Sequence, residues 1–151
     1  MIRNILILIC LVTASNTLSK HSFALEELNY GKKISYSLSY KIDTFLNGEY
    51  GNSISDYNIS SIDLNNDGID EQVLKQKQCH LSKGKCTYLV IAEKKQEILI
   101  LFKINAYNLA IGNIGSNGVK NVLALTNNVN DYNFDIYMWS PARKMYILKA
   151  D

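Results

Sequence analysis

The sequence has little of what marks fibrous, disordered or highly charged chains. Among its 151 residues there are one Pro and eight Gly, which excludes a collagen repeat. Lys and Arg gather only in pairs such as Lys32-Lys33, and the formal net charge is +2, so we do not expect binding to nucleic acid. With 47% hydrophobic and 20% charged residues, the chain has the composition of one globular domain, not of a coiled coil or a disordered tail.

Long hydrophobic runs are also missing, since no stretch approaches the ~20 residues that span a bilayer. The sequence therefore predicts no transmembrane segment. The N-terminus instead has the parts of a secretory signal peptide, namely Arg3, the apolar run from Ile5 to Val12, and small residues around Ala24. We expect residues 1–24 to be the signal peptide and residues 25–151 to be a single periplasmic or secreted domain, with cleavage after Ala14 or Ser15 as the alternatives.

Two cysteines remain after the expected cleavage, Cys79 and Cys86. An even number of cysteines in an oxidising compartment predicts a disulfide. The residues between them include Gly84, so the bridge would close the tip of a hairpin. A metal site is the alternative, but two thiols and His80 do not complete a zinc tetrahedron.

The segment after Gly31 fits two patterns. Ile34, Leu38 and Ile42 are spaced for one face of a helix, but together with Tyr36 and Tyr40 they also give the alternation of a strand. The length of the segment, and Asn47-Gly48 as a C-terminal stop, favour a helix over 32–46. The Ser- and Tyr-rich composition favours a strand; we predict the helix.

The rest of the chain is typical of β-structure, in short segments rich in Ile, Val, Leu and Tyr that are separated by turn residues. Tight connections at 94–96 and 141–143 predict antiparallel hairpins. The expected fold class is α+β, with the N-terminal helix packed on a mainly antiparallel sheet. The predicted strands are 57–64, 71–76, 87–93, 97–104, 106–111, 119–126, 134–139 and 144–149.

Two parts of this β-region resemble each other. Residues 59–74 align with residues 109–124 when Gly68 is set against Gly118, an offset of 50 positions. A strand, a polar loop, a hydrophobic strand, a turn and a further strand follow in the same order after each. We interpret this as an internal duplication.

The loop of the first copy carries residues suited to a hard cation. Oxygen-bearing side chains recur at alternate positions around the turn at Gly68, which suits Ca²⁺ with the Ile69 carbonyl as a further ligand. An EF-hand is excluded, because its twelfth position is Leu74 and a strand follows where a helix is needed. A metal-free turn capped by Asn and Asp is the alternative. The predicted ligands are Asp63, Asn65, Asp67, Ile69 and Glu71.

This stretch resembles the calcium-loop motif of FG-GAP/VCBS repeats, the integrin-alpha-like repeats, as found in small secreted bacterial proteins. The resemblance covers residues 59–148 and rests on the loop 63–71, the Cys79 to Cys86 hairpin and the second copy. It implies β-rich repeats and a structural Ca²⁺. Two repeats are too few for a closed propeller. The second loop lacks every carboxylate, so it is expected to keep the turn and not the ion; its residues are Asn113, Gly115, Asn117 and Asn121.

The sequence contains no catalytic motif: no Gly-x-Ser-x-Gly elbow and no phosphate-binding glycine loop. The only His of the expected mature chain is His80, in the Cys79 to Cys86 hairpin. We therefore predict a non-catalytic binding protein that binds another protein, such as an envelope inhibitor or an immunity protein. One alternative is a calcium-dependent adhesion or carbohydrate-binding module with a glycan ligand. Another is a metal-dependent hydrolase, whose activity would depend on Glu71 or Asp67.

Overall fold

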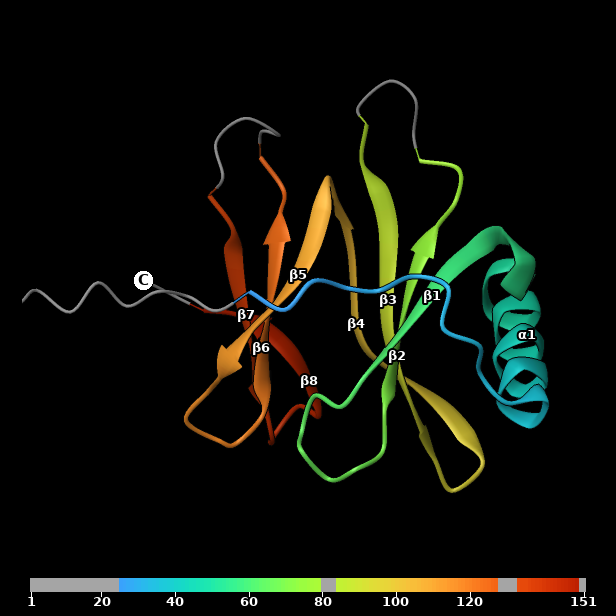
Figure 1. Cartoon of the computed structure of the whole chain (residues 1–151), viewed down its shortest axis with the longest axis horizontal. Helices are drawn as coiled ribbons and strands as arrows, with labels where there is room; N and C mark the ends of the chain where they lie inside the picture. Colours follow the sequence, from blue (N-terminus) through green and yellow to red (C-terminus); the bar gives the residue numbers. More distant parts are fainter. Residues whose placement is uncertain (1–24, 80–83, 128–132, 150–151) are drawn as a thin grey trace, which may run out of the picture.

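The computed structural model describes residues 25–79, 84–127 and 133–149. The expected signal peptide and His80 lie outside these residues. One α-helix, a short 3₁₀ helix and two four-stranded antiparallel sheets make up the described part (Figure 1). The elements are α1 (Tyr36–Tyr50), η1 (Ile54–Asp56), β1 (Tyr57–Ile62), β2 (Glu71–Gln76), β3 (Cys86–Lys94), β4 (Glu97–Ala106), β5 (Asn108–Ile114), β6 (Lys120–Leu125), β7 (Asp135–Ser140) and β8 (Met145–Leu148).

The helix is confirmed, but its predicted bounds of 32–46 are wrong by four residues at each end. Ser35 is the N-cap, and its hydroxyl accepts a hydrogen bond from the Leu38 backbone N–H. At the other end Gly48 lies inside the helix, and the left-handed C-cap residue is Gly51, with φ of 65°. The sequence predicts the stop at Gly48, the first Gly after the apolar face, whereas the structure ends the helix at Gly51.

The eight predicted strands are confirmed to within three residues at each end, but they form two sheets and not one. The strand orders are β1-β2-β3-β4 and β5-β6-β7-β8, and each neighbouring pair is antiparallel. Only Tyr107 separates β4 from β5, and its backbone N–H donates to the carbonyl of Leu125 in the second sheet. The chain therefore passes from one sheet to the other at a single residue. No turn or linker pattern in the local sequence predicts this change.

Two hydrophobic clusters hold the layers together. Helix α1 packs Ile42 and Leu46 against one face of the first sheet, including Leu74 and Leu89. The opposite face of that sheet packs against the second sheet around Tyr88, with the larger cluster between them. Figure 1 shows the resulting order of layers, from α1 at one side to the β5–β8 sheet at the other. No helix in the described part of the chain is long and apolar enough to cross a bilayer.

The β1–β2 and β5–β6 hairpins share one register over residues 58–61 and 108–111, after which the β5–β6 register shifts between Ile111 and Ile114. Ile59 pairs with Leu74, and the positions 50 residues further on, Leu109 and Ala124, also pair. The equivalent faces of the two sheets have different neighbours. Leu74 of the first sheet packs against α1, whereas Leu109 and Ala124 of the second sheet pack between the two sheets. The sheets therefore stack in the same orientation, with α1 covering the first of them.

Candidate functional site

In the loop between β1 and β2, side-chain oxygens accept hydrogen bonds from backbone N–H groups of the same loop. The two carboxylate oxygens of Asp63 accept hydrogen bonds from the N–H groups of Asp67 (3.3 Å) and Gly68 (2.8 Å). The side-chain oxygen of Asn65 also accepts from the Asp67 N–H at 2.9 Å, and Asp67 accepts from Ile69 at 2.8 Å. Gly68 has φ of 83°, a left-handed conformation that glycine adopts without steric cost. The backbone hydrogen bonds, that from Gly68 above all, lower the pKa of Asp63.

Glu71 closes this loop from the start of β2. One carboxylate oxygen accepts the Leu64 N–H at 2.8 Å and the other accepts the Asn65 amide at 3.3 Å. The residue is only 6% exposed, and burial raises the pKa of its carboxyl, with the charges of Asp67 and Asp63 adding to the effect. Glu71 is therefore a buried carboxylate whose two oxygens both hold the loop.

The loop forms one wall of a cleft of about 390 Å³. The other walls come from β3, β4, β7 and the turn after β7, so both sheets contribute. In Figure 1 this is the lower end of the molecule, where the β1–β2, β3–β4 and β7–β8 connections lie. The lining residues are Asn65, Asp67, Ile69, Asp70, Glu71, Ala92, Glu93, Lys94, Leu99, Leu101, Trp139 and Lys144.

A smaller recess of about 110 Å³ continues from the cleft between the sheets. It shares Asn65, Glu71, Leu101 and Trp139 with the cleft and adds Tyr146 among its lining residues. The Trp139 ring packs against Tyr146 with centroids 5.6 Å apart. The Trp139 carbonyl accepts a hydrogen bond from the Asn117 amide at 2.7 Å. The second loop thus holds the backbone of Trp139 through Asn117, while the first loop, 63–71, lines the cleft.

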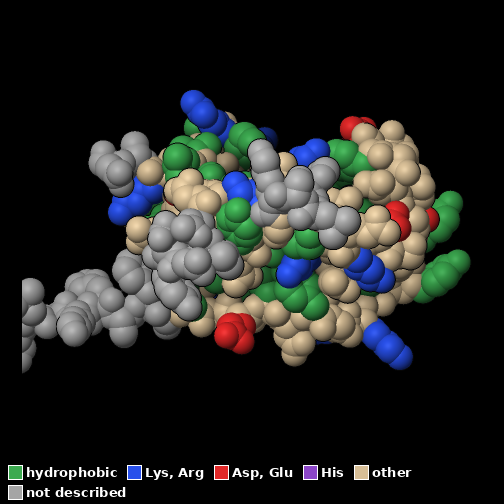
Figure 2. Space-filling view, turned by 90° about the horizontal axis from the view of Figure 1, so that it is seen from above, with side chains coloured by type: hydrophobic (Ala, Val, Ile, Leu, Met, Phe, Trp, Pro, Cys, Tyr) green, Lys and Arg blue, Asp and Glu red, His purple; other side chains and the backbone are tan. Residues whose placement is uncertain are grey.

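Most acidic groups around the cleft already have partners. Asp70 is ion-paired with Lys32 at 2.8 Å, and Glu93 is ion-paired with Lys41. Lys94 and Lys144, which also line the cleft, form no ion pair with any residue in the described ranges. At the opposite end of the molecule, Figure 2 shows Lys and Arg side chains scattered singly over the surface, with no continuous basic patch in view.

The donor chemistry of the loop suits Ca²⁺, although the side chains are engaged with the backbone. Carboxylate and amide oxygens are the ligands that hard cations prefer, and each carboxylate oxygen has more than one lone pair. Within residues 25–79, 84–127 and 133–149, no group of three or more His, Cys, Asp or Glu side chains is arranged to hold a metal ion. Calcium binding by Asp63, Asn65, Asp67, Ile69 and Glu71 stays a prediction.

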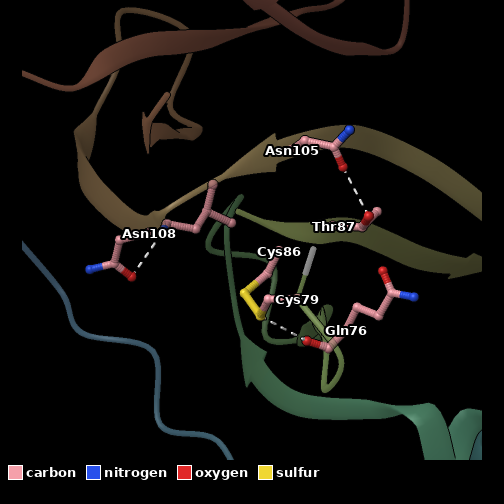
Figure 3. The surroundings of a disulfide bond; sticks show 7 residues. Gln76, Cys79, Cys86, Thr87, Asn105 and Asn108 are labelled. Carbon is pink, nitrogen blue, oxygen red and sulfur yellow. Dashed lines mark hydrogen bonds between the residues drawn. A yellow bond between two sulfur atoms is a disulfide. The ribbon is translucent and has the colours of Figure 1, made fainter. Parts of the chain in front are cut away.

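The disulfide lies at the other end of the first sheet, away from the cleft. Cys79 and Cys86 are joined, with Cα atoms 4.2 Å apart, where β3 begins (Figure 3). Beside it the Thr87 hydroxyl and the Asn105 side chain are hydrogen-bonded across β3 and β4 at 2.9 Å. The bridge ties β3 to the segment after β2 and contributes nothing to the cleft.

The sequence predicted no cleft, but the predicted calcium loop forms one of its walls. Four of the five predicted ligands line it, namely Asn65, Asp67, Ile69 and Glu71, whereas Asp63 does not. Trp139, Leu99 and the two lysines come from strands and turns distant in sequence. No motif marks them, because only the stacking of the two sheets brings them to the loop.

Comparison with protein-family models gives no match, and curated proteins and solved structures give none either. The resemblance to FG-GAP/VCBS repeats therefore rests on the sequence alone, namely loop 63–71, the Cys79 to Cys86 hairpin and the second copy.

Proposed function

We propose that this protein is a non-catalytic binding protein that acts outside the cytoplasm and recognises another protein through the cleft between its two sheets. The main support for this proposal is that the predicted calcium loop forms one wall of the cleft. The volume of about 390 Å³ is in the range of ligand sites, and the lining combines apolar residues such as Leu99 and Trp139 with charged residues such as Lys144.

The chemistry of Glu71 supports binding over catalysis. A buried carboxyl with a raised pKa is a common general acid. Here, however, both oxygens accept hydrogen bonds from Leu64 and Asn65, which gives the burial a structural purpose. Glu71 is accordingly a loop-positioning residue in the proposal.

We infer the compartment from the predicted signal peptide and from the disulfide, since disulfides persist in oxidising compartments. We further propose that the two sheets are duplicated FG-GAP-like repeats. The shared register of the β1–β2 and β5–β6 hairpins at an offset of 50 supports this, as do the positive φ values of Gly68 and Gly118, 83° and 76°. Ca²⁺ in loop 63–71 would be a structural ion that fixes the cleft wall.

The test is capture from an envelope extract with the oxidised protein and two variants. Leu99→Asp changes an apolar wall residue that is 39% exposed, and Leu148→Asp changes a 55% exposed leucine that does not line the cleft. We expect one stoichiometric partner that the wild type and Leu148→Asp retain and Leu99→Asp loses. Equal retention by all three would contradict the cleft as the binding surface, and no partner at high bait concentration would contradict protein binding. Both variants are first checked for a cooperative unfolding transition.

A further inference from the structure

We propose that the outer edge of β1 pairs, at Ser61, with an extended segment of another polypeptide chain through main-chain hydrogen bonds. This goes beyond the proposed function, because no residue of β1 lines the cleft between the sheets. Three observations support it: the outward-facing backbone of Ser61, the cavity beside it, and the pairing of the equivalent residue in the second sheet.

β1 is an edge strand, so every second residue points its backbone N–H and carbonyl away from β2. The Lys77 N–H donates to the Asp56 carbonyl, which places the even-numbered residues of β1 in the ladder with β2. The Ile59 carbonyl faces the other way and accepts from the Gly31 N–H at 3.1 Å. Ser61 has the same orientation as Ile59, and its N–H and carbonyl form no hydrogen bond with a described residue. β1 therefore presents a main-chain donor and acceptor at Ser61.

A cavity of about 380 Å³ lies beside this part of β1. Residues 60–62 form one wall, and residues 26–32, which we call the strap, form the other. In Figure 1 the strap is part of the blue segment that runs from β5 past β1 towards α1. The cavity therefore gives an incoming chain room to reach the main-chain groups of Ser61.

The second sheet shows which kind of partner this edge position takes. Ser61 pairs with Gln72 across the first hairpin, and Ile111, 50 residues further on, pairs with Val122 in the same register. Ile111 is thus the equivalent of Ser61. It exchanges two backbone hydrogen bonds, of 2.9 Å and 3.3 Å, with Glu26 of the strap. The occupant that fits the Ser61 position is therefore extended main chain, as Glu26 is at Ile111.

The side chains around Ser61 favour recognition by main chain over recognition by charge. Edge strands often carry charged residues or proline, which prevent pairing with other chains. β1 has neither, since its sequence is Tyr-Asn-Ile-Ser-Ser-Ile. In the cavity lining Glu26 and Lys32 are ion-paired within the molecule, and Glu27 alone forms no ion pair with a described residue. Addition of a strand to a sheet edge obtains its affinity from main-chain hydrogen bonds, which suits this lining.

The probe is a library of random nonapeptides displayed on phage, selected for binding to the immobilised, oxidised protein. The test variant is Ser61→Pro, which removes the outward N–H and leaves the ladder with β2, because edge positions tolerate proline where the N–H faces away. The matched control is Ser61→Ala, which also loses the hydroxyl bonded to Gln72 but keeps the N–H. Leu99→Asp separates binding at this edge from binding in the cleft. Hydrogen exchange of the Ser61 amide, followed by NMR, is a second readout that needs no variant.

We expect the selected peptides to bind the wild type, Ser61→Ala and Leu99→Asp alike, and to bind Ser61→Pro at least about tenfold more weakly. They should also slow the exchange of the Ser61 amide, which should be fast in the protein alone. If Ser61→Pro lacks a cooperative unfolding transition, the exchange measurement decides.

Three results would overturn the inference: no enriched peptide, equal binding to Ser61→Pro, or unchanged exchange of the Ser61 amide on peptide binding. Peptides that Leu99→Asp loses and Ser61→Pro retains would bind in the cleft, which contradicts this inference and supports the proposed function. The two proposals therefore fail separately.

Discussion

The carboxylate of Glu71 accepts the backbone N–H of Leu64 at 2.8 Å, across the base of the loop that lines the cleft. Leu64 in turn uses its carbonyl to accept the Lys120 N–H of the second sheet at 2.7 Å. One residue therefore links the predicted calcium loop, the buried carboxylate and the neighbouring sheet.

Removing the Glu71 side chain should destabilise the protein more than removing its charge. Glu71→Ala leaves the Leu64 N–H without its buried acceptor, and we expect a loss of about 1–3 kcal/mol in the free energy of unfolding. Glu71→Gln keeps an acceptor and removes the repulsion from Asp67 and Asp63, so in chelator it should stay close to the wild type. Denaturant unfolding of both variants measures the difference, and an equal loss in both would show that the hydrogen bond is not the source.

Asp63 should make the protein more stable at neutral pH than in acid. Backbone hydrogen bonds lower its folded-state pKa, so the unfolded chain binds the proton first as the pH falls. Its contribution is fully present above the unfolded pKa of about 4 and disappears as the pH falls through the lower folded value. Asp63→Asn should show a smaller loss of stability between neutral and acidic pH than the wild type in chelator. Identical pH profiles would contradict the assignment.

Two buried tyrosine hydroxyls should respond to removal in opposite directions. The Tyr88 hydroxyl is buried without a hydrogen-bond partner among the described residues, whereas the Tyr146 hydroxyl donates to the Lys120 carbonyl at 2.9 Å. Tyr88→Phe should therefore stabilise the protein, and Tyr146→Phe should destabilise it, each by about 1 kcal/mol. Thermal unfolding of the matched pair decides this. A destabilising Tyr88→Phe would mean that the hydroxyl has a partner after all.

Two glycines near the end of α1 should also respond oppositely to alanine. Gly48 lies inside the helix with open space around it, so Gly48→Ala should stabilise the protein by about 0.5–1 kcal/mol. Gly51 caps the helix with φ of 65°, where a Cβ costs about 1–2 kcal/mol. If Gly48→Ala were the destabilising change, the helix would end where the sequence pattern placed it, near residue 46.

Local patterns predicted the elements of this fold well, because alternation and turn residues act over a few positions. The hairpin turn at Lys94-Lys95-Gln96 is an example, since Lys95 and Gln96 both adopt the positive φ of a tight turn. The pattern around Ile34 to Ile42 fitted helix and strand alike, and the N-cap at Ser35 was overlooked.

The division into two sheets and the cleft between them could not be predicted in the same way. Tyr107 alone separates strands that belong to different sheets, so the break is decided by packing and not by a long linker. Trp139 lies beside Asn65 and Glu71 in one recess only because the two sheets pack against each other. The loop residues stand out in the sequence because oxygen-bearing side chains recur at alternate positions, whereas Leu99, Leu101 and Trp139 on the other walls have no such signature.

We propose that loop 63–71 binds Ca²⁺, and this loop lines one cleft together with Trp139. The most direct measurement adds Ca²⁺ to chelator-treated, oxidised protein and follows both the unfolding midpoint and Trp139 emission. Binding to the native state alone stabilises it by about 2.7 kcal/mol when free Ca²⁺ is a hundredfold above the Kd. We predict a higher midpoint and a changed emission, both abolished by Asp67→Ala and retained by Asn113→Ala in the second loop. An unchanged midpoint and emission would contradict the claim and leave Asp63 to Glu71 as a metal-free turn.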